Sequence, residues 1–239
     1  MRSDPFVSDE KPRVRRDKGS FFVYMNSRDE LLPDLCGKKI STSLGQLRFS
    51  VSSQDRDRHH VKRLLLLSGP IAGGKTSVSA SLQERHGFVP ISSGSFLRAQ
   101  LAAQNEPIDR RNLQELGDSL DRATDFSWLI ESVASPAIEA RPDAHNWLLD
   151  AVRKPQQVAL FRLRFGDVVR HVHIFAPESV LEQRCAARGL SHLEDYQASV
   201  LHPNEQSARS LAGFADKVLD TKQYTPLEIA DQIMNIWET

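Results

Sequence analysis

Cysteine and long apolar runs are scarce in this sequence of 239 residues. Its two cysteines, Cys36 and Cys185, have no metal-like spacing, so neither a disulfide framework nor a zinc site is indicated. The clearest apolar run is Leu64 to Leu67, whereas a membrane-spanning helix needs about 20 apolar residues. The N-terminus also has no apolar core of the signal-peptide type. These absences predict a cytoplasmic protein with no membrane partner.

The sequence also lacks an excess of charge of either sign. Lys and Arg number 31, Asp and Glu number 31, and the formal net charge is zero. A general nucleic-acid-binding protein usually has a clear basic excess, which is missing here. Apolar residues make up 40% and charged residues 26% of the chain, which is typical of a globular protein and too apolar for a disordered one.

The zero net charge is the sum of two unlike parts. Residues 1–60 contain 12 basic and 9 acidic side chains, a net charge of +3, and residues 61–239 have a net charge of −3. We interpret the first part as an N-terminal extension, with a flexible basic leader over 1–20, possible short accessory strands over 21–51 and a polar linker over 52–60. We expect the leader to be a solvated tail. Contact of the leader with nucleic acid is the alternative.

Strand-like and helix-like segments alternate through residues 61–239. This alternation predicts right-handed crossovers and a mainly parallel five-stranded sheet in a three-layer α/β/α domain. The apolar runs predict strands over 61–67, 88–91, 145–150, 168–175 and 217–219. The intervening segments predict helices over 75–86, 94–104, 109–122, 126–140, 155–164, 178–188 and 226–237.

A phosphate-binding motif follows the first predicted strand. The segment Gly69-Pro70-Ile71-Ala72-Gly73-Gly74-Lys75-Thr76 matches G-x-x-x-x-G-K-[ST] in full and precedes a helix, which is the pattern of a P-loop NTPase fold. Its glycines let backbone N–H groups surround phosphate oxygens, and the helix N-terminus adds favourable partial charge. Lys75 should bridge the β- and γ-phosphates of ATP, and the Thr76 hydroxyl should bind Mg²⁺. The predicted nucleotide-binding residues are Gly69, Ala72, Gly73, Gly74, Lys75, Thr76 and Ser77.

The segment from His86 to Arg98 resembles the stretch after the P-loop helix in adenylate kinase and related nucleoside monophosphate kinases. In those kinases a short strand ends in Ser/Thr-Gly-Asp and leads into a helix with an arginine. The resemblance implies that Arg98 holds the acceptor phosphate and that Ser93 and Gly94 line its pocket. An ordinary exposed residue on a helix is the alternative for Arg98. This sequence departs from the pattern at Ser95, where those kinases usually have Asp.

The segment from Arg110 to Gly117 looks like part of dephospho-CoA kinase-like and deoxynucleotide kinase-like proteins. The resemblance implies that Arg110 and Arg111 clamp an anionic acceptor. A solvated helix start is an equal alternative for this basic pair.

The segment from Trp147 to Pro155 resembles the D-G-x-R strand end of the same families, with Ala151 in place of the glycine. A carboxylate at a strand end beside a P-loop can hold Mg²⁺ through water or orient the acceptor, which gives Asp150 both roles. Arg153 is then placed to neutralise phosphate charge. A helix cap in the following loop is the alternative for Asp150.

The segment from Val180 to Gly189 resembles the entry to the lid of these kinases, and residues 189–203 would be a short lid. Arg184 and Arg188 are four residues apart, so one helical face presents both guanidinium groups. Mobile arginines of this kind stabilise the negative charge of a transferring phosphoryl group. Cys185 lies between the two arginines, and we expect it to be a packing residue. The alternative is a thiol whose pKa the two arginines lower.

The pattern as a whole is identified as that of the P-loop nucleoside monophosphate kinase-like superfamily. We expect a kinase that uses ATP and Mg²⁺ and has Lys75, Asp150, Arg153, Arg184 and Arg188 as catalytic residues. The expected acceptor is a nucleoside or deoxynucleoside monophosphate. Dephospho-CoA, another hydroxyl acceptor including nucleic acid, and a regulatory ATPase without an acceptor are the alternatives. The sequence does not fix the oligomeric state. His171 and His173 share one strand face, and we expect them to be satisfied sheet residues and not metal ligands.

Overall fold

A computed structural model describes residues 61–150, 152–189, 196–198 and 200–238 of the chain. Its strands are β1 (Arg63–Ser68), β2 (Val89–Ile91), β3 (Asn146–Asp150), β4 (Val169–Phe175) and β5 (Lys217–Asp220). Its α-helices are α2 (Lys75–His86), α3 (Ser93–Ala103), α4 (Arg110–Thr124), α5 (Ser135–Glu139), α6 (Pro155–Phe165), α7 (Glu178–Ala186), α9 (Pro203–Ser210) and α10 (Pro226–Met234). Short 3₁₀ and π segments are η1 (Leu129–Ala134), η2 (Gly166–Val168), η3 (Leu211–Phe214) and η4 (Asn235–Trp237). None of the helices in these ranges is long and apolar enough to cross a membrane.

The five strands form one parallel sheet in the order β2-β3-β1-β4-β5. The first strand is central because its leucines are buried on both faces, which only an inner strand of a covered sheet allows. Leu67 of β1 is in register with Asp150 of β3, so the P-loop begins beside the carboxyl end of β3. This edge of the sheet is where parallel α/β folds bind ligands.

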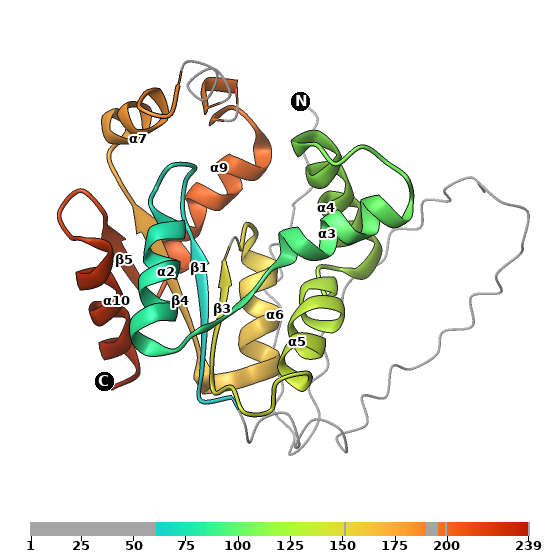
Figure 1. Cartoon of the computed structure of the whole chain (residues 1–239), viewed down its shortest axis with the longest axis horizontal. Coiled ribbons are helices and arrows are strands. Elements are labelled where there is room, and N and C mark those ends of the chain that lie inside the picture. The colour runs from blue at the N-terminus through green and yellow to red at the C-terminus, as the bar shows by residue number, and fades with distance from the viewer. Residues whose placement is uncertain (1–60, 151, 190–195, 199, 239) are drawn as a thin grey trace, which may run out of the picture. The chain divides into compact units, whose positions relative to one another are not determined.

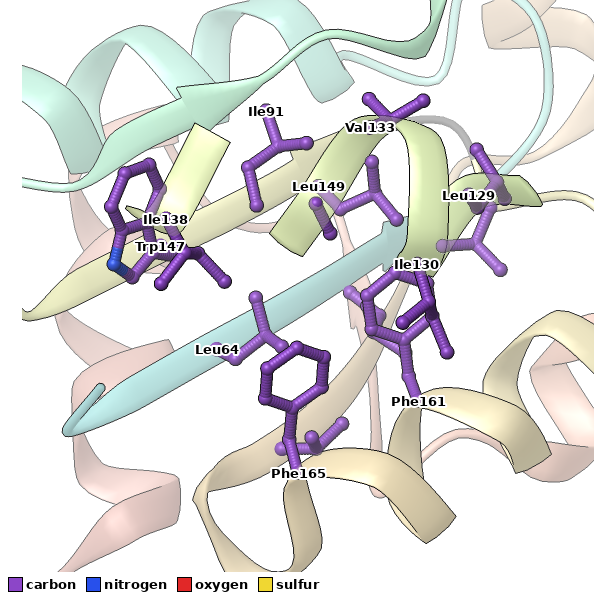
Figure 2. Close-up of a cluster of buried hydrophobic side chains, with 14 of the residues drawn as sticks. Leu64, Ile91, Leu129, Ile130, Val133, Ile138, Trp147, Leu149, Phe161 and Phe165 are labelled. Carbon is purple, nitrogen blue, oxygen red and sulfur yellow. The ribbon is translucent and has the colours of Figure 1, made fainter. Parts of the chain in front are cut away.

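Helices cover the sheet on both faces (Figure 1), and alternate leucines of β1 belong to the two separate cores. Leu64 and Leu66 pack with α6, η1 and α5, where Figure 2 shows Leu64 between Trp147 and the rings of Phe161 and Phe165. Leu65 and Leu67 pack on the other face against α2 and α10. The carboxyl edge of the sheet is thereby held by two buried cores.

The predicted fold class and all five strands are confirmed, with strand ends within two residues of the prediction. The single helix predicted over 126–140 is wrong in its start. Asp125 and Phe126 both have positive φ values (47° and 65°), which ends α4, and η1 and α5 then follow in its place. Helix α9 was not predicted. The predicted leader, accessory strands and linker lie outside the described residues, as do residues 190–195 and 199 of the predicted lid.

Candidate active site

The P-loop turn depends on glycines at positions where a side chain has no room. Gly69 has a φ of +145°, and a Cβ there would collide with the carbonyl group of Ile174 on β4. Gly74 has a φ of +99° and serves as the left-handed N-cap of α2. The first N–H groups of α2 have no carbonyl partner within the helix and are therefore available to an anion. This cradle fits the phosphates of a nucleotide.

Lys75 opens α2 and turns back over the loop. Its Nζ donates to the carbonyl oxygens of Gly69 at 2.8 Å and Pro70 at 2.9 Å. Burial lowers the pKa of Lys75 below its ordinary value, while the negative charges of Asp150 and Glu205 act to raise it. The side chain of Lys75 thus lies at the phosphate cradle, where the negative charges of two carboxylates act on it.

Beside the P-loop lies a pocket of about 620 Å³ formed by the β2–α3 turn, α3, α4, and the β3–α6 loop. It brings together six of the residues predicted to act on the acceptor, although they come from distant parts of the chain. These are Ser93, Gly94, Arg98, Arg110, Asp150 and Arg153. Arg111 does not line the pocket, because its Nε pairs with Glu115 Oε1 at 2.8 Å on the exposed side of α4.

Three arginines of the pocket have no carboxylate partner within 4.0 Å in the described part of the chain: Arg98, Arg110 and Arg153. The guanidinium group of Arg98 lies over Gly94, about 3.5 Å from where a Cβ would stand. A side chain at position 94 would therefore crowd Arg98. Three guanidinium groups with no direct ion pair make the pocket suitable for an anion.

The floor of the pocket is a polar network that the sequence analysis missed. Lys154 Nζ lies 2.8 Å from Asp118 Oδ1 and 3.1 Å from Asp121 Oδ2. Asp121 also accepts hydrogen bonds from Trp128 Nε1 at 2.8 Å and Gln157 Nε2 at 3.1 Å. Burial acts to raise the pKa of Asp118, but its hydrogen bonds from Lys154 and Asn204 lower that pKa overall. The network thereby fixes the part of the pocket lining that comes from α4 and the start of α6.

Arg184 of α7 contacts the P-loop and the loop after β5, whereas Arg188 is exposed. The Nη1 group of Arg184 donates to Ala72 O at 3.2 Å and to Thr221 Oγ1 at 2.8 Å, and Nη2 donates to Thr221 O at 3.0 Å. Cys185 is buried, and burial raises the pKa of its thiol, so packing is the role that its position supports.

His171 and His173 are satisfied by Ser68, the residue before the P-loop. Ser68 Oγ lies 2.7 Å from His171 Nε2 and 3.0 Å from His173 Nδ1. Among the described residues no cluster of His, Cys, Asp and Glu is arranged to hold a metal ion. As expected from the sequence, both rings have a hydrogen-bond partner within the sheet.

A second missed contact joins the P-loop to α9. The N–H group of Ile71 donates to Glu205 Oε1 at 2.9 Å, and Glu205 is buried (8% exposed). Asn204, the preceding residue, donates through Nδ2 to both carboxylate oxygens of Asp118 at 3.2 and 3.0 Å. No local pattern marks these residues, since Asn and Glu at a helix start are usually solvent-exposed caps.

The two residues predicted to hold Mg²⁺ lie next to the P-loop. Thr76 is exposed in the first turn of α2, and Asp150 stands at the end of β3, in register with Leu67 just before the P-loop. Mg²⁺ keeps several waters and uses one or two carboxylate or hydroxyl ligands beside phosphates. The side chains of Thr76 and Asp150 therefore fit such an ion.

Comparison with known proteins identifies the family of the chain. The model of one protein family, described as AAA domain, matches residues 64–212. Adenylate kinases from Brucella ovis and Brucella melitensis are 28% identical over 129 residues, which is 52% of this chain and 64% of theirs. The match thus spans less than two thirds of the length of these relatives. The family match and the adenylate kinase likeness confirm the resemblance to the P-loop nucleoside monophosphate kinase-like superfamily.

Solved structures with a similar arrangement include two small-molecule kinases. The shikimate kinase from Acinetobacter baumannii in complex with shikimate is 16% identical, with a TM-score of 0.46, over 77% of this chain and 96% of that one. The APS kinase of Mycobacterium tuberculosis in complex with AMPPNP and APS is 17% identical, with a TM-score of 0.42, over 75% of this chain and 99% of that one.

Proposed function

The chain belongs to the AAA-domain family, and from that premise we propose that it is an ATP-dependent phosphotransferase acting on a small anionic acceptor. The observation that carries the proposal is the pocket beside the P-loop, lined by Arg98, Arg110 and Arg153, which have no carboxylate partner among the described residues. A switch ATPase needs a P-loop but has no need of a second anion pocket next to it.

The donor nucleotide binds along the P-loop in this proposal. The amides at the start of α2 hold the β-phosphate, and Lys75 exchanges its carbonyl partners for phosphate oxygens. Arg184 lies against the Ala72 carbonyl, at the side of the loop where the lid begins. Thr76, and Asp150 through water, would hold Mg²⁺, which would neutralise phosphate charge.

Transfer joins an acceptor oxygen to the γ-phosphorus as the bond to the β,γ-bridging oxygen breaks, and ADP leaves with that oxygen. Lys75 lies over the P-loop, Arg153 lines the pocket, and the two are close enough for their charges to interact. Their fixed positive charges offset the negative charge spread over the equatorial oxygens. Arg98 and Arg110 bind the negative charge of the acceptor.

The acceptor that this pocket fits best is a nucleoside or deoxynucleoside monophosphate. Its phosphate has a second pKa of about 6 and is largely a dianion at pH 7, so it can attack without a strong base. Two or three arginines are a suitable counter-charge for such a dianion. The volume of about 620 Å³ is in the range of small-molecule sites.

A hydroxyl acceptor is the second candidate, and Asp150 is the observation that favours it. Asp150 lines the pocket at the strand end next to the P-loop, where a carboxylate can accept a hydroxyl proton. The pocket lining also holds as many acidic as basic side chains, which suits an acceptor with hydroxyl groups as well as an anionic one. Dephospho-CoA has both features.

A labelled-phosphate assay tests the proposal. The full chain is incubated with γ-labelled ATP and Mg²⁺ and a panel of nucleoside monophosphates, dephospho-CoA and oligonucleotides. Label is expected in a nucleoside monophosphate, and Lys75→Ala should lower the rate at least a hundredfold while the circular dichroism spectrum is unchanged. Label in dephospho-CoA alone would favour the hydroxyl candidate. Release of inorganic phosphate with no labelled acceptor would refute the kinase proposal.

A further inference from the structure

Glu205 is a buried carboxylate that contacts the phosphate-binding loop without belonging to it. Its Oε1 accepts the N–H of Ile71 at 2.9 Å and lies 3.2 Å from Arg209 Nε. Ile71 is the third residue of the P-loop motif, just before the amides that the motif directs at phosphate. The loop is therefore held from helix α9 at the point where its backbone turns.

Arg209 is itself held on three sides. Its Nη1 lies 2.7 Å from Glu178 Oε2, and its Nη2 donates to the hydroxyl of Tyr196 at 3.1 Å. The Tyr196 hydroxyl donates in turn to Glu178 Oε1. Burial acts to lower the pKa of Arg209, but the hydrogen bonds to Glu178 and Tyr196 raise it overall. Burial and the bond to Glu178 raise the pKa of Tyr196 to about 12, so its proton stays in place at neutral pH.

A negative charge beside a triphosphate site repels the ligand unless something offsets it. Here the ion pair with Arg209 offsets the charge of Glu205. The charge that remains acts on Lys75, whose pKa is lowered by burial while Glu205 acts to raise it. The buried carboxylate of Glu205 thus gives the Ile71 N–H a hydrogen-bond acceptor at a fixed place. Hydrogen bonds to a charged acceptor are stronger than those to a neutral one.

We propose that Glu205 is a positioning residue that fixes the Ile71 peptide and so preorganises the P-loop for nucleotide. Arg209, braced by Glu178 and Tyr196, keeps the carboxylate oriented toward the loop. With the Ile71 N–H held, the amides that follow keep their direction before the nucleotide arrives, and binding needs less ordering of the loop. The inference deepens the proposed function, because it rests on nucleotide binding at the P-loop.

Two measurements on the full chain test the positioning role. Calorimetry gives the Kd of Mg²⁺–AMPPNP, and hydrogen exchange reports the protection of the Ile71 amide in the protein without nucleotide. Glu205→Ala is expected to weaken AMPPNP binding about tenfold and to raise exchange at residues 69–74, because a hydrogen bond to a charged acceptor is lost. Glu205→Gln keeps a carbonyl oxygen for Ile71 and should restore most of the protection and bind within about threefold of wild type.

Glu139→Ala is the matched control, since Glu139 is an exposed glutamate at the end of α5 with no contact to the loop. It should equal wild type in both measurements. A wild-type Kd and wild-type amide protection in Glu205→Ala would overturn the positioning role and leave the proposed function standing. A lowered melting temperature of Glu205→Ala with an unchanged Kd would have the same meaning. If Glu205→Ala does not fold, a Glu205→Gln variant with an unprotected Ile71 amide refutes the role. A wild-type chain that binds no AMPPNP, or binds it equally well as Lys75→Ala, overturns the proposed function as well.

Discussion

At the scale of single residues, the charge of the pocket decides which acceptors can bind. Arg98, Arg110 and Arg153 come from α3, α4 and the β3–α6 loop, and no carboxylate of the described chain neutralises them within 4.0 Å. The pocket carboxylates Asp118 and Asp121 are instead occupied by Lys154. The positive charge of Arg98 therefore stays available at the start of α3, where its guanidinium group lies over Gly94.

Arg98→Ala tests whether that charge binds the acceptor. Removing a charge-assisted hydrogen bond costs about 1.5–3 kcal/mol, so KM for the nucleoside monophosphate should rise at least tenfold. The KM for ATP should change less than twofold, since Arg98 lies in the acceptor pocket. Initial rates with each substrate varied in turn measure both constants.

The control for Arg98→Ala is Arg141→Ala, an exposed arginine after α5 that does not line the pocket. It should leave both KM values unchanged. An equal rise of the ATP KM in Arg98→Ala would mean that the variant has disturbed the P-loop and not the acceptor.

At the scale of helices and strands, the sequence predicts those elements whose signal is local. The buried leucines of β1, the P-loop glycines and the prolines at the first turns of α6 and α10 all lie within short segments. Helix α9 was missed because its buried residues are Asn204, Glu205 and Ala208, which form no apolar stripe. Asn204 bonds to Asp118, which is 86 residues away in the sequence, and Glu205 bonds to Ile71, which is 134 residues away. The acceptor-side arginines were predicted from family motifs, whereas the Asp118–Lys154 floor has no local motif.

The pairing of β1 with β4 contains a pH-dependent contact. Phe214 O can only accept, so His171 Nδ1, at 3.3 Å, carries the proton and leaves Nε2 to accept from Ser68. Ser68 Oγ then accepts from His173 Nδ1. Burial, with the charges of His171 and Lys75, lowers the pKa of His173 to about 4, and burial lowers that of His171. Both rings are thus neutral in the folded protein at pH 7.

Protonation of the unfolded state should therefore destabilise the fold as the pH falls. The unfolded histidine has a pKa of about 6.5, so His173 contributes its full stability above pH 6.5 and loses it between pH 6.5 and about 4. The slope is at most about 1.4 kcal/mol per pH unit for this group. Urea unfolding at pH 7, 6 and 5 measures it, and His173→Asn, which keeps a donor for Ser68, should give a flatter profile. Equal slopes for the two proteins would assign the effect to other groups.

At the scale of the whole molecule, the two hydrophobic cores and the candidate active site share the same strand and helices. The central strand β1 contributes leucines to both cores and ends in the P-loop. Helices α3 and α4 bring the acceptor arginines to the same edge of the sheet, and α9 contacts both the P-loop and Asp118. A ligand in the P-loop therefore acts on elements that also hold the cores together, and its binding energy adds to the stability of the described domain.

That linkage predicts a thermal shift that depends on Mg²⁺ and Lys75. A ligand at 100 times its Kd stabilises the folded state by about 2.7 kcal/mol, and 1 kcal/mol corresponds to about 2–4 °C for a chain of this size. Mg²⁺–AMPPNP at such a concentration should thus raise the melting temperature by about 5–10 °C in differential scanning fluorimetry. Chelation of Mg²⁺ with EDTA should reduce the shift at least by half, because phosphate charge is then offset by Lys75 and the loop amides alone.

Lys75→Ala should abolish most of the shift without lowering the melting temperature of the protein without nucleotide, since burial of Lys75 already opposes its charge. An equal shift in wild type and Lys75→Ala would mean that AMPPNP stabilises the chain at a place other than the P-loop.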